Sequence, residues 1–432
     1  MHNDKKKIAV VGLGFVGLPL SMLLLSKGFT VVGIDLDENK IRSLNNGKSY
    51  ISDISDKSVE ESMKSKRFSV SSSYKNVEES DAIIICVPTP LKEEYVPNLV
   101  YIEKAAEALK AHLQKGQLVV LESSTFPGTT REILQPLLEE SGLEAGKDFH
   151  LAYSPERVDP GNVQFSLGDI PKVIGGITSD CQEVACDLYS KIYQTVVPVS
   201  SPEIAELTKL LENTYRFINI SFINEMAMLC DQMNIDVWEV IAAASTKPYG
   251  FAPFYPGPGI SGHCIPVDPL YLQFKAKEKG VTSNFIELST STNEKIVQYI
   301  VERTLEIVGK EPEETSVLLY GLTYKRDIPD VRDSKAVEVM EHLLEKGVNV
   351  TYHDPHFERI MINGDVHHSV SLLDKELSES DCVVVLTDHS VLPKEQILEK
   401  ANLIFDTRGV LQGAKGTAKV VELGGGTSFF KR

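Results

Sequence analysis

Short apolar runs alternate with longer amphipathic segments between Lys6 and about Val199. The runs are rich in Val and Ile and end at Gly, Pro or Ser, which is typical of buried parallel strands. They are KIAVVGLG, TVVGIDLD, DAIIICVP and QLVVLESST, and two later runs, FHLAYSPER and PKVIGGI, fit the same sheet. Such runs separated by helices predict a doubly wound α/β sheet.

The pattern changes between Pro202 and about Ala243. The segment IAELTKLLENTYRFINISFINEMAMLCDQM has no Gly or Pro, and its apolar residues recur at helical spacing over a broad face. We predict one long helix with Ser200 or Ser201 as N-cap and Pro202 just inside. So apolar a helix needs burial on several sides, which indicates a spine between domains and a candidate dimer surface. The next segment, PYGFAPFYPGPGISGHCIPVDP, is crowded with Gly and Pro and predicts a long functional loop.

After a second helical stretch, from about Ser283 to Val308, the strand-like runs SVLLYGLTYK, VNVTYHDP, CVVVLTD and LIFDTRG follow. The predicted fold is α/β, with two Rossmann-like doubly wound domains joined by a long central helix. We expect a nucleotide-binding domain over residues 1–199, a central helical region with the loop over 200–310, and a second Rossmann-like domain over 311–432.

Composition narrows the class of protein. The apolar fraction of 42% and charged fraction of 24% are those of a soluble globular chain. A net charge of −17 argues against nucleic acid or an anionic membrane as partner, although a local anion site remains compatible with it. The first residues contain no apolar run long enough for a signal peptide, so none is expected, and no stretch reaches the roughly 18 apolar residues of a membrane-spanning helix. The six cysteines lack metal-ligand spacing, so we expect reduced thiols, no metal and a cytoplasmic protein.

A glycine fingerprint follows the first strand run. Gly12, Gly14 and Gly17, with Phe15 and Val16 between them, open an apolar helix in the pattern that binds a dinucleotide pyrophosphate. Asp35 ends the second run and would accept from both ribose hydroxyls, which favours NAD over NADP. Lys40, a further expected cofactor contact, slightly weakens the preference for NAD, since a lysine could contact a 2′-phosphate. The alternative is a tight turn in some other α/β domain.

Several polar residues have both a chemical and a structural interpretation. Cys264 lies among Gly and Pro, where nearby backbone amides can lower the pKa of a thiol and bind an oxyanion. The alternative is a buried, inert cysteine. Asp268 could orient a water or a cation, or it could be a turn residue before a proline. Lys209 and Asn213 stand one turn apart on the long helix, and Lys209 could steady an alkoxide or lie in solvent. Glu156 follows a strand end, where α/β sites gather, or is an ordinary loop carboxylate.

Seven motifs in order resemble the UDP-glucose/GDP-mannose dehydrogenase family over nearly the whole chain. They are GLGFVGLPL, CVPTP with Thr89, SSTFPGTT with Thr125, SPER with Glu156, LTKLLENTYR with Lys209 and Asn213, GHCIPVDP with Cys264 and Asp268, and YGLTYKRDIPDVRDS with Lys325 and Arg332.

The resemblance implies a four-electron oxidation of a primary alcohol at C6 of a nucleotide sugar. Cys264 would carry a thiohemiacetal and then a thioester, and water would release the acid. Lys209 and Asn213 would stabilise the oxyanion, and Asp268, with Thr125 and Glu156, would handle the water. The last domain would hold UDP with Lys325 at the substrate, while Arg332, Thr89 and Thr125 would reach NAD. Further substrate contacts are expected at Arg157, Tyr255 and Gly259, and a homodimer or higher homo-oligomer is expected.

Two departures from the family pattern bear on activity and substrate. Ser261 stands where the family usually has a glycine, so a side chain there would crowd the loop or need another backbone angle. The residues Ser-Pro-Glu-Arg-Val-Asp-Pro-Gly resemble the branch acting on N-acetylhexosamines. We therefore expect UDP-N-acetylglucosamine, then UDP-N-acetylmannosamine, then UDP-glucose, and a role in polysaccharide synthesis. Two alternatives stay open: a two-electron dehydrogenase of hydroxy acids or polyols, and an inactive nucleotide-sugar sensor.

Overall fold

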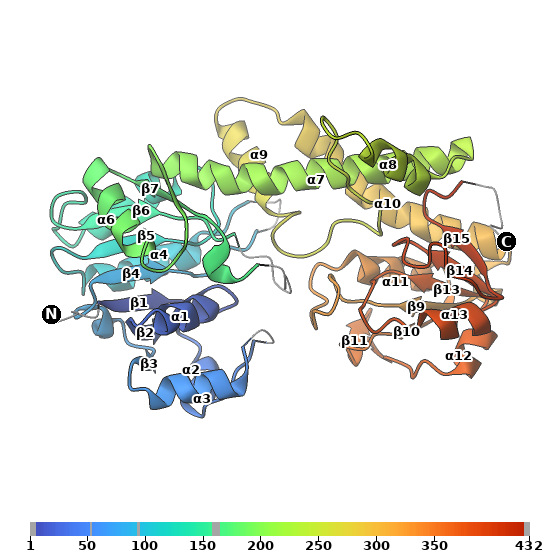
Figure 1. Ribbon diagram of the computed structural model, residues 1–432, viewed down its shortest axis with the longest axis horizontal. Helices are drawn as coiled ribbons and strands as arrows, with labels where there is room; N and C mark the ends of the chain where they lie inside the picture. Colours follow the sequence, from blue (N-terminus) through green and yellow to red (C-terminus); the bar gives the residue numbers. More distant parts are fainter. Residues whose placement is uncertain (1–5, 52–53, 93–95, 158–164, 427–432) are drawn as a thin grey trace. The chain divides into compact units, whose positions relative to one another are not determined.

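The computed structural model describes residues 6–51, 54–92, 96–157 and 165–426. The chain forms two compact units. Unit 1 comprises Met1–Glu212 and Asp268–Thr282, and unit 2 comprises Asn213–Val267 and Ser283–Arg432. The predicted class is confirmed, because each unit is built on a largely parallel sheet with helices around it (Figure 1). The three-part division expected from the sequence stays a prediction.

Unit 1 contains an eight-stranded sheet in the order β3-β2-β1-β4-β5-β6-β7-β8. Its strands are β1 (Lys7–Val11), β2 (Thr30–Ile34), β3 (Phe68–Ser71), β4 (Ala82–Ile85), β5 (Leu118–Leu121), β6 (His150–Tyr153), β7 (Lys172–Gly176) and β8 (Val196–Val199). Strands β1 to β6 run parallel, whereas β7 pairs antiparallel with β6 and parallel with β8. The two edge strands β3 and β8 were not predicted.

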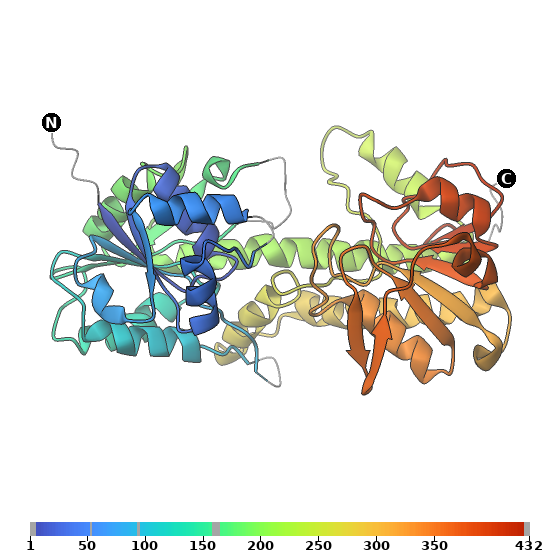
Figure 2. The same ribbon diagram turned by 90° about the horizontal axis from the view of Figure 1, so that it is seen from below.

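Helices cover both faces of this sheet (Figure 2). They are α1 (Gly17–Ser26), α2 (Glu38–Asn45), α3 (Asp56–Lys64), α4 (Val100–Lys110), α5 (Gln135–Glu139), α6 (Ser179–Tyr189) and α9 (Asp268–Glu278), with short turns η1 (Tyr74–Val77), η3 (Thr129–Leu134) and η4 (Leu167–Asp169). The central strands are buried on both sides, which explains their continuous apolar runs. Helix α9 begins at the end of the predicted loop and continues through a segment before Ser283 for which no element was predicted.

The long helix α7 (Pro202–Met233) begins where it was predicted. The amide of Ile204 donates to Ser201 Oγ (3.4 Å), so Ser201 caps the helix. The apolar pattern continues beyond Met233, but the helix ends there because the next residue, Asn234, has a left-handed backbone with a φ of +57°. Asp236 then caps α8 (Val237–Ser245) by accepting from the Trp238 and Glu239 amides.

Unit 2 contains a five-stranded parallel sheet in the order β10-β9-β13-β14-β15 and a separate hairpin. Its elements are α10 (Asn284–Val308), η5 (Pro312–Glu314), β9 (Ser316–Tyr320), α11 (Lys335–Glu345), β10 (Asn349–His353), the hairpin β11 (Arg359–Ile362) and β12 (Asp365–His368), α12 (Asp374–Glu379), β13 (Cys382–Val385), α13 (Lys394–Lys400), β14 (Leu403–Asp406) and β15 (Lys419–Glu422).

Alternate residues of β9 define the two faces of the second sheet. Val317 and Leu319 pack in the core that α10 and α11 share, whereas Leu318 and Tyr320 pack with apolar residues of α12 and α13. This alternation is the period of two that a strand imposes. Within the described residues, no helix is both long and apolar enough to cross a membrane.

Candidate active site

The turn from β1 to α1 carries three glycines with different steric demands. Gly12 has a φ of +91°, and a Cβ there would lie 2.6 Å from the Cys86 carbonyl oxygen. A Cβ on Gly17 would lie 1.8 Å from the Gly12 carbonyl oxygen, so helix and strand can pack closely only around a glycine. A Cβ on Gly14 would meet no atom within 4 Å, which leaves its backbone open to a ligand. This cradle fits the pyrophosphate of a dinucleotide.

The N-terminus of α1 is available to an anion. Within the described residues, which include all of α1, no side chain accepts a hydrogen bond from the amides at this end of the helix. Phe15, just before the helix, is 56% exposed, and Val16 occupies the N-cap position. Backbone amides of the first turn can therefore donate to phosphate oxygens.

Asp35 ends the second strand run and already organises the turn. Its carboxylate accepts from the Leu13 amide (2.8 Å) and the Asp37 amide (2.9 Å). Lys40 donates to the same carboxylate at 3.0 Å. Lys40 thus lies beside Asp35, and the contact of either residue with a ribose stays a prediction.

The loops after β4 and β5 contain the two candidate threonines. The Thr89 carbonyl accepts from the Tyr271 hydroxyl of α9, and buried Thr125 donates to the Phe126 carbonyl (3.1 Å). Glu206 of α7 fixes the second loop, since its carboxylate accepts from the Gly128 amide (2.6 Å) and the Thr130 amide (2.8 Å). Burial raises the pKa of Glu206 to about 7, although these hydrogen bonds oppose the rise. The role of Glu206 was not predicted from the sequence. The feature that could have indicated it is a carboxylate on the buried, apolar side of a long helix.

Glu156 and Lys209 are brought together in unit 1. Lys209 Nζ donates to the Glu156 backbone carbonyl at 2.5 Å, and both side chains are buried. The alternative of a solvated Lys209 is therefore wrong. Asn213 follows one turn later on α7.

A buried ionic cluster that the sequence did not predict lies next to Glu156. Lys172 Nζ is 2.7 Å from Glu122 Oε2 and 3.6 Å from Glu156 Oε2, and Glu122 also accepts from the Tyr189 hydroxyl. The three charged residues come from different strands or the loops that follow them, and Tyr189 comes from α6, so no local motif marks the cluster. The cluster fixes the Glu156 side chain from one side while Lys209 holds its backbone.

Arg157 and Asp268 occupy ordered positions in unit 1. Arg157 makes two hydrogen bonds to the Glu212 carboxylate (2.6 and 3.1 Å) and one to the Pro171 carbonyl (2.8 Å). Asp268 is buried as the first residue of α9. The residues Val-Asp-Pro-Gly that follow Arg157, on which the substrate prediction partly rested, lie outside the described residues.

In unit 2, the glycine- and proline-rich segment forms an ordered loop that presents Cys264. Asn293 of α10 accepts from the Ile260 amide (2.5 Å) and donates to its carbonyl (3.0 Å). Asn224 of α7 accepts from the Gly257 amide (2.9 Å). Cys264 is exposed, whereas the other five cysteines are buried or half-buried.

Ser261 is accommodated in this loop. The left-handed positions fall on Gly259 (φ +116°) and Gly262 (φ +86°), and Ser261 has no positive φ. Its hydroxyl instead accepts from the Lys335 amide at the start of α11 (2.9 Å). The expectation that a side chain at this position would crowd the loop or need another backbone angle was wrong.

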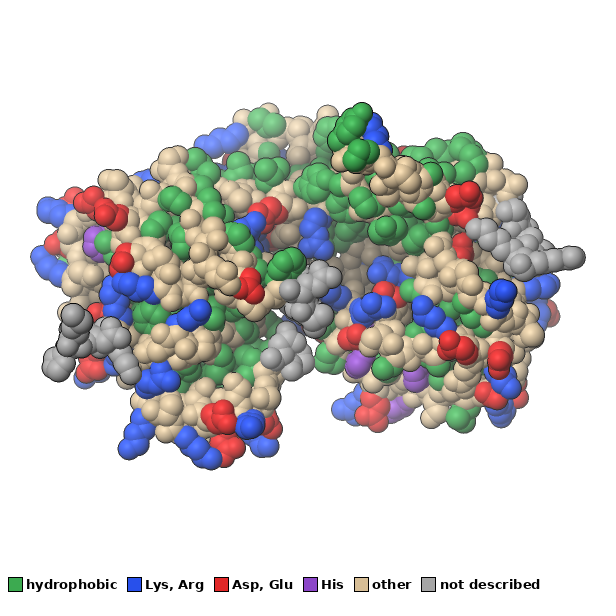
Figure 3. Space-filling view, viewed as in Figure 1, with side chains coloured by type: hydrophobic (Ala, Val, Ile, Leu, Met, Phe, Trp, Pro, Cys, Tyr) green, Lys and Arg blue, Asp and Glu red, His purple; other side chains and the backbone are tan. Residues whose placement is uncertain are grey.

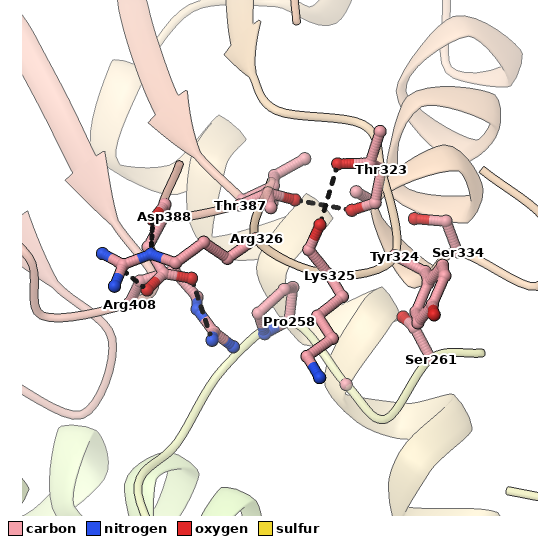
Figure 4. A pocket seen from close by; sticks show the side chains of 13 residues that line it. Pro258, Ser261, Thr323, Tyr324, Lys325, Arg326, Ser334, Thr387, Asp388 and Arg408 are labelled. Atoms are coloured by element: carbon pink, nitrogen blue, oxygen red, sulfur yellow. Dashed lines mark hydrogen bonds and ion pairs between the residues drawn. The ribbon is translucent and has the colours of Figure 1, made fainter. Parts of the chain in front are cut away.

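An open cavity of about 190 Å³ lies in unit 2 beside the loop (Figure 4). Gly259 and Ser261 line it from the loop, and Lys325, Arg326 and Arg408 line it from the ends of the sheet. Asp388 orients both arginines, at 3.4 Å from Arg326 and 3.1 Å from Arg408. Three cations in one cavity of an acidic chain suit a phosphorylated ligand. Lys325 and Gly259 were predicted, and the two arginines were missed.

Tyr255 and Arg332, two of the predicted contacts in unit 2, are not among the residues that line this cavity. Tyr255 is 57% exposed and stacks on Trp238, with ring centroids 6.1 Å apart. Arg332 makes a bidentate contact with Asp330, which raises the pKa of Arg332. Their proposed contacts to substrate and NAD stay predictions.

Comparison with known proteins agrees with this geometry. The chain matches the three domains described for the UDP-glucose/GDP-mannose dehydrogenase family: the NAD binding domain over residues 6–194, the central domain over 203–295 and the UDP binding domain over 318–413. A UDP-N-acetyl-D-mannosamine dehydrogenase of Methanococcus maripaludis is 34% identical over 442 residues, covering 98% of each chain. A UDP-N-acetyl-D-glucosamine 6-dehydrogenase of Pseudomonas aeruginosa is 37% identical over 354 residues, covering 81% of this chain and 82% of the relative.

A solved structure shares the fold along the whole chain. The UDP-D-ManNAc dehydrogenase of Pyrococcus horikoshii superposes with a TM-score of 0.87 at 31% identity, covering 97% of this chain and 99% of that one. The glycine cradle with Asp35, the exposed Cys264 and the cationic cavity lie in the three matched regions. The chain therefore belongs to the UDP-glucose/GDP-mannose dehydrogenase family and is an NAD-dependent nucleotide-sugar dehydrogenase.

Proposed function

We propose that this enzyme oxidises the C6 alcohol of a UDP-N-acetylhexosamine to the carboxylate in two successive oxidations, with Cys264 as nucleophile. The observation that carries the proposal is the exposure of Cys264 on a loop held by Asn224 and Asn293, next to a cationic cavity. An exposed thiol among five shielded ones is suited to attack a substrate.

The chemistry divides into two oxidations and one hydrolysis. In the first, C6 loses a hydride and its hydroxyl loses a proton, which gives an aldehyde. The Cys264 thiolate then forms a bond to that carbon, and the resulting tetrahedral thiohemiacetal can lose a second hydride to become a thioester. Water attacks the thioester carbonyl, the C–S bond breaks, and the acid leaves with the thiol regenerated. NAD, when bound, supplies the acceptor for each hydride.

Residues of α7 and the β6 loop would stabilise these steps. Lys209 is held by the Glu156 carbonyl at 2.5 Å, so its ammonium has a fixed position from which to steady a developing oxyanion, together with Asn213. Glu156, Asp268 and Thr125 are buried polar groups that would orient the hydrolytic water. Gly12, Gly14, Gly17 and Asp35 would hold NAD, with Phe15, Val16, Lys40, Thr89 and Arg332 as further contacts.

The cavity in unit 2 supports a UDP-sugar as substrate. Lys325, Arg326 and Arg408 supply positive charge for a diphosphate, and Gly259 lines the same cavity. Of the N-acetylhexosamines, the sequence favours UDP-N-acetylglucosamine, which the Pseudomonas relative's name carries. UDP-N-acetylmannosamine, named in the Methanococcus relative, is the second candidate, and UDP-glucose is the third.

We also propose a homodimer formed on α7. Tyr215, Phe222 and Leu229 recur every seven residues along this helix and are 51%, 58% and 47% exposed. Figure 3 shows apolar side chains gathered over α8 and the neighbouring part of α7. A second copy would cover such a stripe. Cytoplasmic location and a role in polysaccharide synthesis stay predictions.

The test is the amount of NADH released from a limiting amount of each UDP-sugar. Two equivalents, with formation of the acid lost in Cys264→Ala and retained in the matched control Cys186→Ala, are expected. One equivalent that Cys264→Ala leaves unchanged would identify a two-electron enzyme. Binding of UDP-sugar without NADH from any of the three sugars would support the sensor. A highest kcat/KM for UDP-glucose would overturn the proposed substrate class.

A further inference from the structure

Two imidazoles and a carboxylate meet at the carboxyl end of the unit 2 sheet. Asp327 lies in the loop after β9, His356 lies just after β10, and His389 lies just after β13. These are three adjacent strands, so residues far apart in the sequence come together. One donor atom from each lies within 4.8 Å of the other two.

The two separations that involve Asp327 suit a small transition-metal ion. Asp327 Oδ1 is 3.4 Å from His356 Nε2 and 3.6 Å from His389 Nδ1. A tetrahedral zinc ion with bonds of about 2.0–2.2 Å holds its ligand atoms about 3.3–3.6 Å apart. The two histidine rings meet edge to face, with centroids 4.9 Å apart.

His389 has the outer partners that a metal-binding histidine requires. It is buried, and its Nε2 lies 3.3 Å from Asp354 Oδ2 and 3.2 Å from Thr323 Oγ1. Asp354 Oδ2 is itself fixed by the Leu322 and Thr323 amides (2.7 and 3.0 Å). A carboxylate on one ring nitrogen fixes the tautomer and directs the other nitrogen to the metal.

The Nδ1 atom of His389 faces Asp327. It accepts from the Asp327 amide at 3.1 Å, which places its lone pair on this side of the ring. Asp327 Oδ1 in turn accepts from the Ser390 amide (2.9 Å). A metal would take over the lone pair of Nδ1 and displace the Asp327 amide, while the side chains of Asp327 and His356, 37% and 31% exposed, leave room for a water ligand.

We propose that Asp327, His356 and His389 bind one divalent transition-metal ion of the zinc class. Two imidazoles with one carboxylate favour zinc or cobalt over magnesium, which prefers oxygen ligands alone. Asp327 follows Lys325 and Arg326 in the loop that lines the cavity, so the ion would fix this loop. The proposal does not depend on the reaction that the enzyme catalyses.

The experiment measures zinc retained by the chelator-treated full-length protein after dialysis, by elemental analysis, with cobalt absorption in the visible as a second readout. Native protein should retain one equivalent and show the intense bands of tetrahedral cobalt. His356→Gln, at a partly exposed position, should weaken zinc binding about tenfold or more. His342→Gln, a histidine on the exposed side of α11, is the matched control and should change nothing.

Cys264 needs its own variant, because an exposed thiol also binds zinc. Zinc retained by Cys264→Ala and lost from His356→Gln and Asp327→Asn supports the site. No retention by native protein, equal retention by His356→Gln, or loss only in Cys264→Ala would overturn it.

Discussion

Replacing Lys172 by Met should destabilise unit 1, because it leaves two buried carboxylates without their shared cation. The side chains of Lys172, Glu122 and Glu156 are only 3%, 0% and 9% exposed. Burial disfavours the charged form of Lys172, but the Glu122 carboxylate, with Tyr193 and Glu156, outweighs it and raises the pKa of Lys172. The cluster is therefore an ion pair that loses its cation on substitution.

Removing one partner of a buried ion pair costs about 3–5 kcal/mol, and Met preserves most of the packing of the lysine stem. We expect the free energy of unfolding of unit 1 to fall by this amount in Lys172→Met near pH 8. The loss should shrink as the pH falls, because the unpaired Glu122 then takes up a proton. The double variant Lys172→Met/Glu122→Gln removes one carboxylate as well and should cost about 2 kcal/mol or less.

Tryptophan fluorescence does not report on this cluster, since the single tryptophan, Trp238, lies in unit 2. Hydrogen exchange of the β5 and β7 amides, followed by mass spectrometry at about pH 6 and about pH 8, gives the opening free energy of the sheet. Lys191→Met, which removes an exposed pair with Asp187, is the control and should change stability by less than about 0.5 kcal/mol. A loss below about 1 kcal/mol in Lys172→Met, or a double variant no more stable than the single one, would refute the reasoning.

Three further predictions follow from the site geometry. Gly14→Ala should leave unit 1 folded but weaken NAD binding about tenfold or more, whereas Gly17→Ala should destabilise the unit itself; NAD titration and thermal melting separate the two. Iodoacetamide should alkylate Cys264 before the other thiols, because it is exposed while burial raises the pKa of Cys186, and peptide mass spectrometry checks this. Burial raises the pKa of Glu206 from its ordinary value of 4.5 to about 7. The protonated side chain therefore stabilises unit 1 fully below about pH 4.5, and this contribution, up to about 3 kcal/mol, is lost as the pH rises through about 7. Glu206→Gln should remove the resulting pH dependence, measured by hydrogen exchange of the loop after β5.

The sequence predicted the central strands of both sheets and the edge strand β10, and it missed the other three edge strands, for a physical reason. Strands β1, β4 and β5 are buried on both faces, so their residues are continuously apolar. The missed strands β3, β8 and β15 lie at sheet edges, where most positions are exposed or only partly buried and the apolar run is broken. Strand β8 even contains Pro198, which an edge tolerates because one side of the strand needs no ladder hydrogen bond.

Motif residues at the site were predictable, whereas their supports were not. Cys264, Lys209 and Glu156 stand in local patterns with recognisable chemistry. Lys172 pairs with Glu122 across fifty residues, and Glu206 binds the amide of Thr130 across seventy-six. Such contacts depend on strand order and on where loops end, and neither is encoded in a local spacing.

The two units share the same arrangement after the first strand of each sheet: a glycine turn whose next amide donates to an aspartate. In unit 1, Gly12 follows β1 with a φ of +91°, and the next amide, that of Leu13, donates to Asp35 after β2. In unit 2, Gly321 follows β9 with a φ of +83°, and the next amide, that of Leu322, donates to Asp354 after β10. In both sheets, the strand after the glycine turn lies beside the strand before it.

The same turn suits different ligands in the two units because the residues that follow the glycine differ. Unit 1 continues with Gly14 and Gly17, and the Asp35 side chain keeps a 10% exposed edge at which a ribose can bind. Unit 2 places Thr323 and Arg326 at the corresponding spacing, and the Asp354 carboxylate is fully buried against His389. Unit 2 therefore lacks the open backbone that a pyrophosphate needs at this turn, and presents arginine and lysine side chains to its ligand instead. Shared architecture with exchanged side chains accounts for one dinucleotide site and one cationic cavity in a single chain.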